Sequence, residues 1–208
     1  MEILNEISTL LQKGKAKDVK ELVTKALDEG IPAQQILDEG LLSGMNVIGE
    51  KFKNNEVFVP EVLIAARAMN AGVEILKPVL VAGGTEAKGV AVLGTVKGDL
   101  HDIGKNLVKI MLEGKGLEVV DLGVDVSADQ FVSAAKEHDA DVICCSALLT
   151  TTMGEMKEVV DKVKSEGLDV KVMIGGAPVT QSYCDQIGAD RYTSDAASAA
   201  EVALTLCK

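Results

Sequence analysis

The feature that most constrains the fold is an alternation, from residue 89 onward, of short Val- and Ile-rich runs with longer stretches of helical periodicity. Such an alternation is typical of repeated βα units, whose crossover helices join parallel strands. We therefore expect an α/β domain with a five-stranded parallel sheet and helices on both faces. The expected strands are 89–95, 118–122, 141–146, 170–174 and a short one near 191–192, and the expected helices are 103–113, 128–137, 154–166, 180–187 and 196–206.

The residues before this alternation carry helical periodicity only. Four helices are expected there, one beginning near Pro32 and another near Pro60, and each has a single apolar stripe. Helices of this kind bury their stripes by packing together as a small bundle. The sequence thus predicts two domains, a four-helix bundle over 1–84 and an α/β domain over 88–208, with Gly83-Gly84-Thr85-Glu86 as a linker.

Composition and charge exclude several classes of protein. The 32 Asp and Glu residues outnumber the 21 Lys and Arg residues, and the resulting net charge of −11 repels the phosphate backbone of nucleic acids. No apolar run approaches the roughly 20 residues that span a bilayer, and the N-terminus carries acids where a secretory signal carries basic residues. We therefore expect a cytoplasmic protein without a nucleic-acid or membrane partner. The four cysteines form no CxxC pair, which favours reduced, buried thiols over disulfides or a zinc site.

Glycines and polar residues gather where three of the expected strands end. The segments are 98–104 after the first strand, 146–152 after the third and 175–178 after the fourth. In a Rossmann-like (flavodoxin-like) sheet of order 2-1-3-4-5, ligands bind outside the carboxyl ends of the strands where the order reverses, between strands one and three. The three segments are therefore expected to converge on one site.

Asp99 and His101 suggest a metal at that site. The Asp99 carboxylate can accept the Nδ1–H of His101, which fixes the tautomer and presents Nε2 to a metal ion. No second histidine, cysteine pair or carboxylate cluster stands nearby in the sequence, whereas zinc takes three or four protein ligands. One protein ligand suffices when the metal arrives already chelated, as in a macrocycle.

The motif Asp99-x-His101-x-x-Gly104, followed by Ser146-x-Leu148 and Gly175-Gly176, resembles the cobalamin-binding signature of methionine synthase and related corrinoid proteins. The gaps between the three parts, 41 residues over 105–145 and 26 over 149–174, are similar to those of that family. Upstream, Phe58-Val59-Pro60-Glu61-Val62 with Ala66-Arg67 and Met69 resembles the helical cap of the same proteins. The two-domain layout is similar to the stand-alone corrinoid proteins of methanogen and acetogen methyltransferase systems.

This resemblance implies a bound cobalamin or related corrinoid in the base-off state, with His101 as the lower axial ligand of cobalt. It places Thr152 where the family has a serine that completes a relay with His101 and Asp99. Phe58 and Leu63 are expected to shield the upper face; the alternative is that they belong to the bundle core. The cofactor-binding residues expected on the α/β domain are Gly98, Asp99, His101, Asp102, Ile103, Gly104, Ser146, Leu148, Thr150, Thr152, Gly175, Gly176 and Ala177. No residue of the chain is expected to be catalytic.

The resemblance further implies a methyl carrier. Its cobalt(I) corrin would accept a methyl group from a methylamine, a quaternary amine or a related donor through a substrate-specific methyltransferase. A second methyltransferase would pass that group to a thiol or to tetrahydrofolate, and a reductive activation protein would be a further partner. Two alternatives are the cobalamin subunit of a radical isomerase, which the helical cap disfavours, and a cobalamin-based sensor, for which residues 1–208 leave no room for a signalling module.

Overall fold

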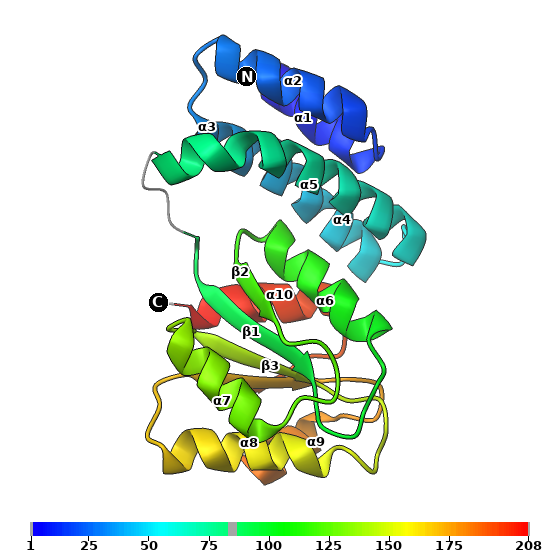
Figure 1. Ribbon diagram of the computed structural model, residues 1–208. Coiled ribbons are helices and arrows are strands. Elements are labelled where there is room, and N and C mark those ends of the chain that lie inside the picture. Colours follow the sequence, from blue (N-terminus) through cyan, green and yellow to red (C-terminus); the bar gives the residue numbers. More distant parts are fainter. Residues whose placement is uncertain (1, 83–86, 208) are drawn as a thin grey trace. The chain divides into compact units, whose positions relative to one another are not determined.

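The computed structural model describes residues 2–82 and 87–207, and it divides into two compact units, Met1–Glu86 and Ala87–Lys208 (Figure 1). The linker expected at 83–86 lies outside the described residues. Among the residues that are described, no helix is long and apolar enough to cross a membrane.

The first unit is helical, as expected. Its elements are α1 (Glu2–Gln12), α2 (Ala16–Asp28), α3 (Ala33–Gln35), η1 (Ile36–Leu42), α4 (Ser43–Lys53) and α5 (Val59–Ala82). Their apolar stripes meet in a common core of aliphatic side chains, among them Ile7, Leu11, Val19, Val23, Leu41, Met45, Ile48, Val62, Met69 and Leu76. A Cβ at Gly44 would lie only 3.0 Å from the Ser8 carbonyl oxygen, so this glycine allows α1 and α4 to approach closely.

One helix of this unit differs from the expectation. The sequence predicts a single α-helix from Pro32 onward, but α3 continues directly into the π-helical segment η1 before α4 begins. Leu41 and Leu42, which are adjacent in η1, are both buried. Because helical periodicity alone does not distinguish an i→i+4 from an i→i+5 hydrogen-bond pattern, the sequence could not reveal this segment.

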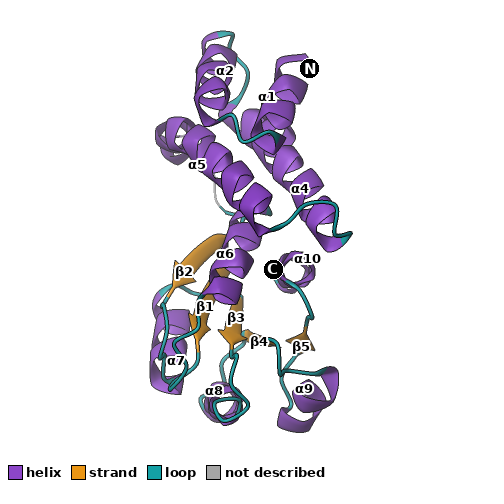
Figure 2. Ribbon diagram, turned by 90° about the vertical axis from the view of Figure 1, so that its right-hand side faces the viewer, coloured by secondary structure: helices purple, strands orange, loops and turns teal. Residues whose placement is uncertain are grey.

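The second unit is an α/β domain of the expected order. A five-stranded parallel sheet has the strand order β2-β1-β3-β4-β5. Helices α6 and α10 cover one face of the sheet, and α7, α8 and α9 cover the other (Figures 1 and 2). Every bound lies within one residue of its prediction: the strands are β1 (Val90–Thr95), β2 (Glu118–Asp121), β3 (Val142–Ser146), β4 (Lys171–Gly175) and β5 (Arg191–Tyr192), and the helices are α6 (Ile103–Gly114), α7 (Ala128–Glu137), α8 (Gly154–Ser165), α9 (Gln181–Ile187) and α10 (Ala196–Leu206).

The strand register brings three strand ends to the same level of the sheet. Thr95, the last residue of β1, pairs with Ser146 of β3, which in turn pairs with Gly175 of β4. Large side chains are packed beneath this edge; Phe131 of α7 is fully buried against β1, where Gly94 has no side chain to exclude it. The loops that follow β1, β3 and β4 therefore start side by side.

The cysteines are free thiols throughout the described residues. Cys144 and Cys145 are buried in β3, and burial raises the pKa of the Cys144 thiol to about 12. Thiols of such high pKa are protonated near neutral pH and are poor metal ligands. These two residues therefore belong to the core of the sheet, as the sequence predicted.

Candidate functional site

Asp99 is the centre of the site at the carboxyl ends of the strands. Its side chain is fully buried and accepts five hydrogen bonds. Oδ1 accepts the backbone N–H and the Nδ1–H of His101, at 3.1 and 2.7 Å. Oδ2 accepts the N–H groups of Leu148 and Leu149, at 2.8 and 3.1 Å, and the Thr152 hydroxyl at 3.0 Å. One carboxylate thus fastens the loop after β1 to the loop after β3.

These hydrogen bonds keep the Asp99 carboxyl ionised. Burial by itself raises the pKa of Asp99, but hydrogen bonds from the Leu148 N–H and from the side chain and N–H of His101 outweigh it, and the pKa lies well below its usual range. An ionised carboxylate can only accept, so the proton of the short His101–Asp99 hydrogen bond belongs to Nδ1. In the neutral imidazole, this tautomer places the lone pair on Nε2 of His101.

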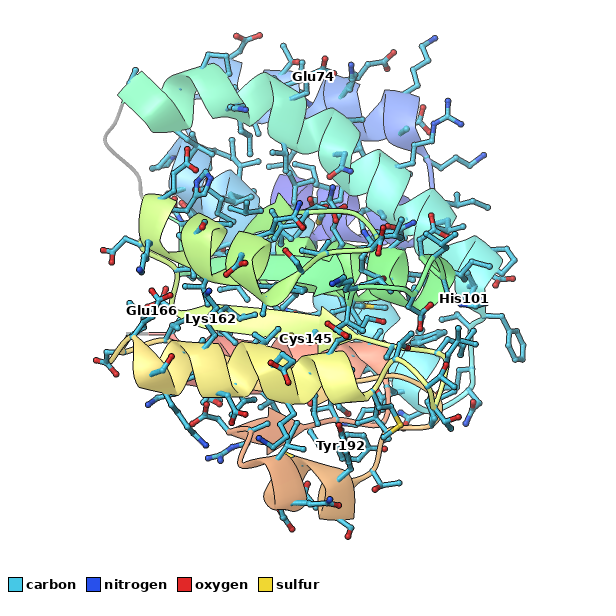
Figure 3. The ribbon with its side chains drawn as sticks, turned by 60° about the horizontal axis from the view of Figure 1, so that its bottom comes forward. Glu74, His101, Cys145, Lys162, Glu166 and Tyr192 are labelled. Atoms are coloured by element: carbon cyan, nitrogen blue, oxygen red, sulfur yellow. The ribbon has the colours of Figure 1, made fainter. Side chains whose placement is uncertain are left out.

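His101 is held at its backbone as well as at its ring. The hydroxyl of Thr95, a fully buried residue, donates to the His101 carbonyl oxygen at 2.8 Å. About half of the His101 side chain remains exposed, and Figure 3 shows it among the loops at the edge of the sheet, away from the buried Cys145. Within residues 2–82 and 87–207, no group of three or more His, Cys, Asp or Glu side chains could hold a metal ion. A metal bound by Nε2 would therefore need most of its ligands from a chelating molecule.

Apolar side chains on the segments that flank His101 fit such a molecule. Leu100, Ile103, Leu148 and Leu149 are all exposed, although large apolar side chains are normally buried. Beside them, a Cβ at Gly104 would meet no atom within 4 Å, so the fold itself gives no reason for a glycine there. An apolar surface with open space above it and one imidazole nitrogen suits a flat macrocycle with a central metal ion.

The two glycines at the end of β4 have different reasons to be glycine. Gly176 has a φ of 134°, and a Cβ there would overlap the carbonyl oxygen of Ala147, so the chain itself requires this glycine. Gly175 is in the sheet, and its Cβ would lie at 3.5 Å from the Thr193 carbonyl oxygen, an ordinary contact. The residue that could leave a slot for a ligand beside the sheet is therefore Gly175, with the exposed Ala177 next to it.

The remaining predicted residues of the α/β unit have local roles that the structure defines. Gly98 has a left-handed backbone with a φ of 79°. Asp102 precedes α6 and accepts a hydrogen bond from the Asn106 side chain at 3.1 Å. Ser146 is half-buried at the end of β3 and Thr150 is exposed in the loop that follows, while the hydroxyl of Thr152 bonds Asp99 and the Leu149 carbonyl oxygen.

Phe58 and Leu63 lie in the helical unit and are not part of its core. Their exposed fractions are 63% and 49%, so the alternative of plain core packing is wrong. Phe58 directly precedes α5, and its N–H donates to the Glu61 carboxylate at 3.0 Å. Helix starts favour Ser, Thr, Asp or Asn at this position, so local stability gives no reason for an exposed aromatic residue there.

Two residues at the site were missed by the sequence analysis. Thr95 holds the His101 carbonyl group, and Asp125, in the loop after β2, accepts the Gly98 N–H at 2.7 Å. Thr95 is the last residue of β1, and Asp125 lies in the loop after the neighbouring strand β2. Their positions at strand ends were the available signal in the sequence. Val- and Gly-containing surroundings made both residues look like ordinary strand-end positions.

Comparisons with known proteins agree with this geometry. A B12 binding domain family matches residues 89–203, and a second B12 binding domain family matches residues 3–77. Dimethylamine corrinoid protein 3 of Methanosarcina acetivorans is 46% identical over 199 residues, which are 95% of this chain and 93% of that protein.

Two solved structures resemble the whole chain. One is a chain of the methanol:cobalamin methyltransferase complex MtaBC from Methanosarcina barkeri, with a TM-score of 0.90 at 32% identity over 99% of this chain and 79% of that chain. The other is a cobalamin-binding protein from Desulfitobacterium hafniense DCB-2, with a TM-score of 0.81 at 34% identity over 99% of this chain and 98% of that chain. The chain therefore belongs to the corrinoid proteins, a family whose members contain B12-binding domains.

Proposed function

We propose that this chain is the methyl-carrying subunit of a corrinoid-dependent methyltransferase system. The observation that carries the proposal is the His101 imidazole, whose Nδ1 is held by the buried Asp99 carboxylate and whose Nε2 is left free to bind a metal. When bound, the corrinoid supplies a cobalt ion that takes up and gives away a methyl group. The chain would bind the cofactor and orient its histidine ligand, and a partner enzyme would activate the donor.

In this proposal Nε2 of His101 would bind the cobalt ion from its lower side, in place of the nucleotide base of the cofactor. Asp99 fixes the tautomer and the direction of the imidazole, as carboxylates commonly do for metal-binding histidines. Gly175 of β4, which has no side chain, would leave room for the nucleotide, and the Ser146 and Thr150 hydroxyls would supply hydrogen-bonding groups. Phe58 and Leu63 provide exposed apolar surface to shield the methyl group.

The donor and the partners are also part of the proposal. The similarity to a dimethylamine corrinoid protein favours a methylated amine as donor. A similar chain was solved in a methanol:cobalamin methyltransferase complex, which supports a substrate-specific methyltransferase as first partner. We include a second methyltransferase, acting towards a thiol or tetrahydrofolate, and a reductive activation protein that restores the reduced cofactor.

The axial ligand can be tested with protein labelled with nitrogen-15 histidine and loaded with cobalt(II) cobalamin. Electron spin resonance should show axial nitrogen splitting that changes between unlabelled and labelled protein, because the splitting depends on the nuclear spin of the ligand nitrogen. His101→Ala should remove this isotope effect. The other histidine of the chain is His138, which caps the end of α7, and His138→Ala is the matched control that should retain the effect. An isotope effect that persists in His101→Ala contradicts the assignment.

The carrier role needs a second test. The chain, loaded with cobalamin that a chemical reductant has brought to cobalt(I), should become methylated by a methylated amine when a methyltransferase of the trimethylamine, dimethylamine or monomethylamine class is added, and remain unmethylated without it. Methylation by the amine in the absence of any partner, or failure with all three classes, would contradict a carrier for methylated amines.

A further inference from the structure

We propose that Asp125, in the loop after β2, is a positioning residue that holds the His101 loop in its metal-binding geometry. This inference rests on the proposed function, because it concerns the orientation of the proposed cobalt ligand. Asp125 forms hydrogen bonds with the backbone of Gly98 and Asp99, which lie three and two residues before the proposed ligand His101.

Asp125 bonds this loop through both its side chain and its backbone. Its Oδ1 accepts the Gly98 N–H at 2.7 Å, and its own N–H donates to the Asp99 carbonyl oxygen at 3.0 Å. Together these bonds fix the backbone on both sides of the Gly98–Asp99 peptide. The direction of the Asp99 side chain follows from that backbone, and His101 Nδ1 in turn follows the Asp99 carboxylate.

The conformation of Asp125 adds to this conclusion. Its φ of 56° is in the left-handed region, which is unfavourable for most side chains and which Asp and Asn tolerate better than other residues. Gly98, its hydrogen-bond partner, is also left-handed, with a φ of 79°. The hydrogen bond between Gly98 and Asp125 thus joins two residues that both have a left-handed backbone.

Asp125 is itself anchored to the end of β1. Thr95 N–H donates to the Gly123 carbonyl oxygen and Val126 N–H donates to the Thr95 carbonyl oxygen, each at 2.9 Å. A β-bridge between Val96 and Val126 continues this pairing beyond the strand. The loop after β2 is therefore a rigid extension of the sheet, and it can transmit a fixed position to Gly98.

A buried ion pair ties the other end of the His101 loop to the same region. Lys105, in the first turn of α6, is buried and donates to Asp121 Oδ1, at the end of β2, at 2.7 Å. Because an unpaired ammonium group is costly to bury, this contact strongly favours the observed placement of α6. Residues 98–105 are thus held at one end by Asp125, in the loop after β2, and at the other end by Asp121, the last residue of β2.

The test compares two substitutions that separate the carboxylate from the backbone conformation. Asp125→Gly tolerates the left-handed backbone and removes the acceptor, whereas Asp125→Asn tolerates the same backbone and keeps an acceptor oxygen. Asp139, after α7, is exposed and also left-handed, with a φ of 48°, so Asp139→Gly is the matched control for a gain of glycine flexibility.

Three measurements are made on each full-length variant: cobalamin affinity, the nitrogen-15 histidine effect in electron spin resonance, and amide hydrogen exchange of Gly98 and His101 without cofactor. Asp125→Gly should lower the affinity by about 10- to 100-fold, the usual range for groups that orient a metal ligand. It should also weaken the isotope effect and speed exchange at both amides. Asp125→Asn should restore most of each property, and Asp139→Gly should match the parent.

The inference fails when Asp125→Gly matches Asp139→Gly in affinity, in axial nitrogen and in exchange, because a merely structural role predicts that result. Failure of the proposed function looks different, since the parent itself would then show no isotope effect. In that case, unchanged exchange at Gly98 and His101 in Asp125→Gly overturns the positioning role, and faster exchange supports it.

Discussion

The two units prepare their candidate site residues in opposite ways. In the α/β unit, the groups around His101 are held by hydrogen bonds within the protein itself, with five donors on Asp99 alone. In the helical unit, Phe58 and Leu63 stand exposed, and Phe58 occupies a helix start that favours a small polar residue. Hydrogen bonds within the α/β unit thus fix the orientation of His101. Phe58 and Leu63 of the helical unit, in contrast, would become buried only on contact with a ligand or another surface.

The largest effect is expected from Asp99→Asn, which removes the carboxylate that orders the site of the α/β unit. An amide places an NH₂ group at one of two oxygen positions that now receive only donors. At Oδ2 the Leu148 and Leu149 N–H groups lose their acceptor; at Oδ1 the His101 N–H loses its acceptor, while the half-exposed ring can switch tautomer. Unfolding without cofactor should become easier by about 4 kcal/mol, since each orphaned buried donor costs about 1–3 kcal/mol and the remaining hydrogen bonds lose their charged acceptor. Urea unfolding measures the change.

The matched control is Asp139→Asn at an exposed left-handed position, which should leave stability unchanged. Equal stability of Asp99→Asn and the parent would show that the network around Asp99 is not the source of order in the α/β unit.

Glycine substitutions at the end of β4 should distinguish a glycine that is needed for folding from one that leaves room for a ligand. Gly176→Ala forces a Cβ into the Ala147 carbonyl oxygen and should destabilise the ligand-free protein by about 3 kcal/mol. Gly175→Ala meets only an ordinary contact and should leave stability nearly unchanged while it weakens cobalamin binding. Urea unfolding and cofactor titration separate the two effects. Full cobalamin affinity in Gly175→Ala, with a bulkier Gly175→Leu behaving alike, would exclude the slot.

Acid should remove much of what Asp99 contributes. Because its pKa is lower in the folded protein than in the unfolded chain, its contribution is fully present above the ordinary carboxyl pKa of about 4 and declines as the pH falls below it. The stability difference between the parent and Asp99→Asn should therefore be constant from neutral pH to about pH 5 and shrink by about 2 kcal/mol towards pH 2.5. Urea unfolding across this range measures it, and a difference that grows in acid would contradict an ionised, hydrogen-bonded Asp99.

Phe58→Ser tests the helical unit and should have the smallest effect. Serine caps a helix better than phenylalanine, and Phe58 is mostly exposed, so the ligand-free protein should gain about 0.5–1 kcal/mol. The same change should expose the cofactor and hasten light-induced loss of its methyl group. Leu63→Ser, within α5, should hasten that loss without the gain in stability. Unaltered photolysis in both variants would count against shielding by these side chains.

The α/β fold was predictable because its signals are local. Val-rich runs, helical periodicity and turn residues define each strand and helix, and the order 2-1-3-4-5 then brings the ends of β1, β3 and β4 together. The convergence of Asp99, His101 and Thr152 followed from these positions.

What the sequence could not show depends on backbone conformation. The hold of Asp125 on Gly98 requires two left-handed residues in register, and the need for Gly176 comes from a neighbouring carbonyl group rather than from a ligand. Helical periodicity likewise does not report the change of hydrogen-bond pattern in η1. Each of these features joins residues that are distant in the sequence or alters geometry without altering the apolar pattern.

The five donors on Asp99 have a consequence for the motion of the imidazole. Four of them, the N–H groups of His101, Leu148 and Leu149 and the hydroxyl of Thr152, do not belong to the ring. If the ring turns away, the carboxylate keeps these four and is not left as a lone buried anion. The His101 ring can therefore change its orientation while the hydrogen bonds between the loops after β1 and β3 remain. The imidazole could leave a bound metal without disturbing the sheet beneath.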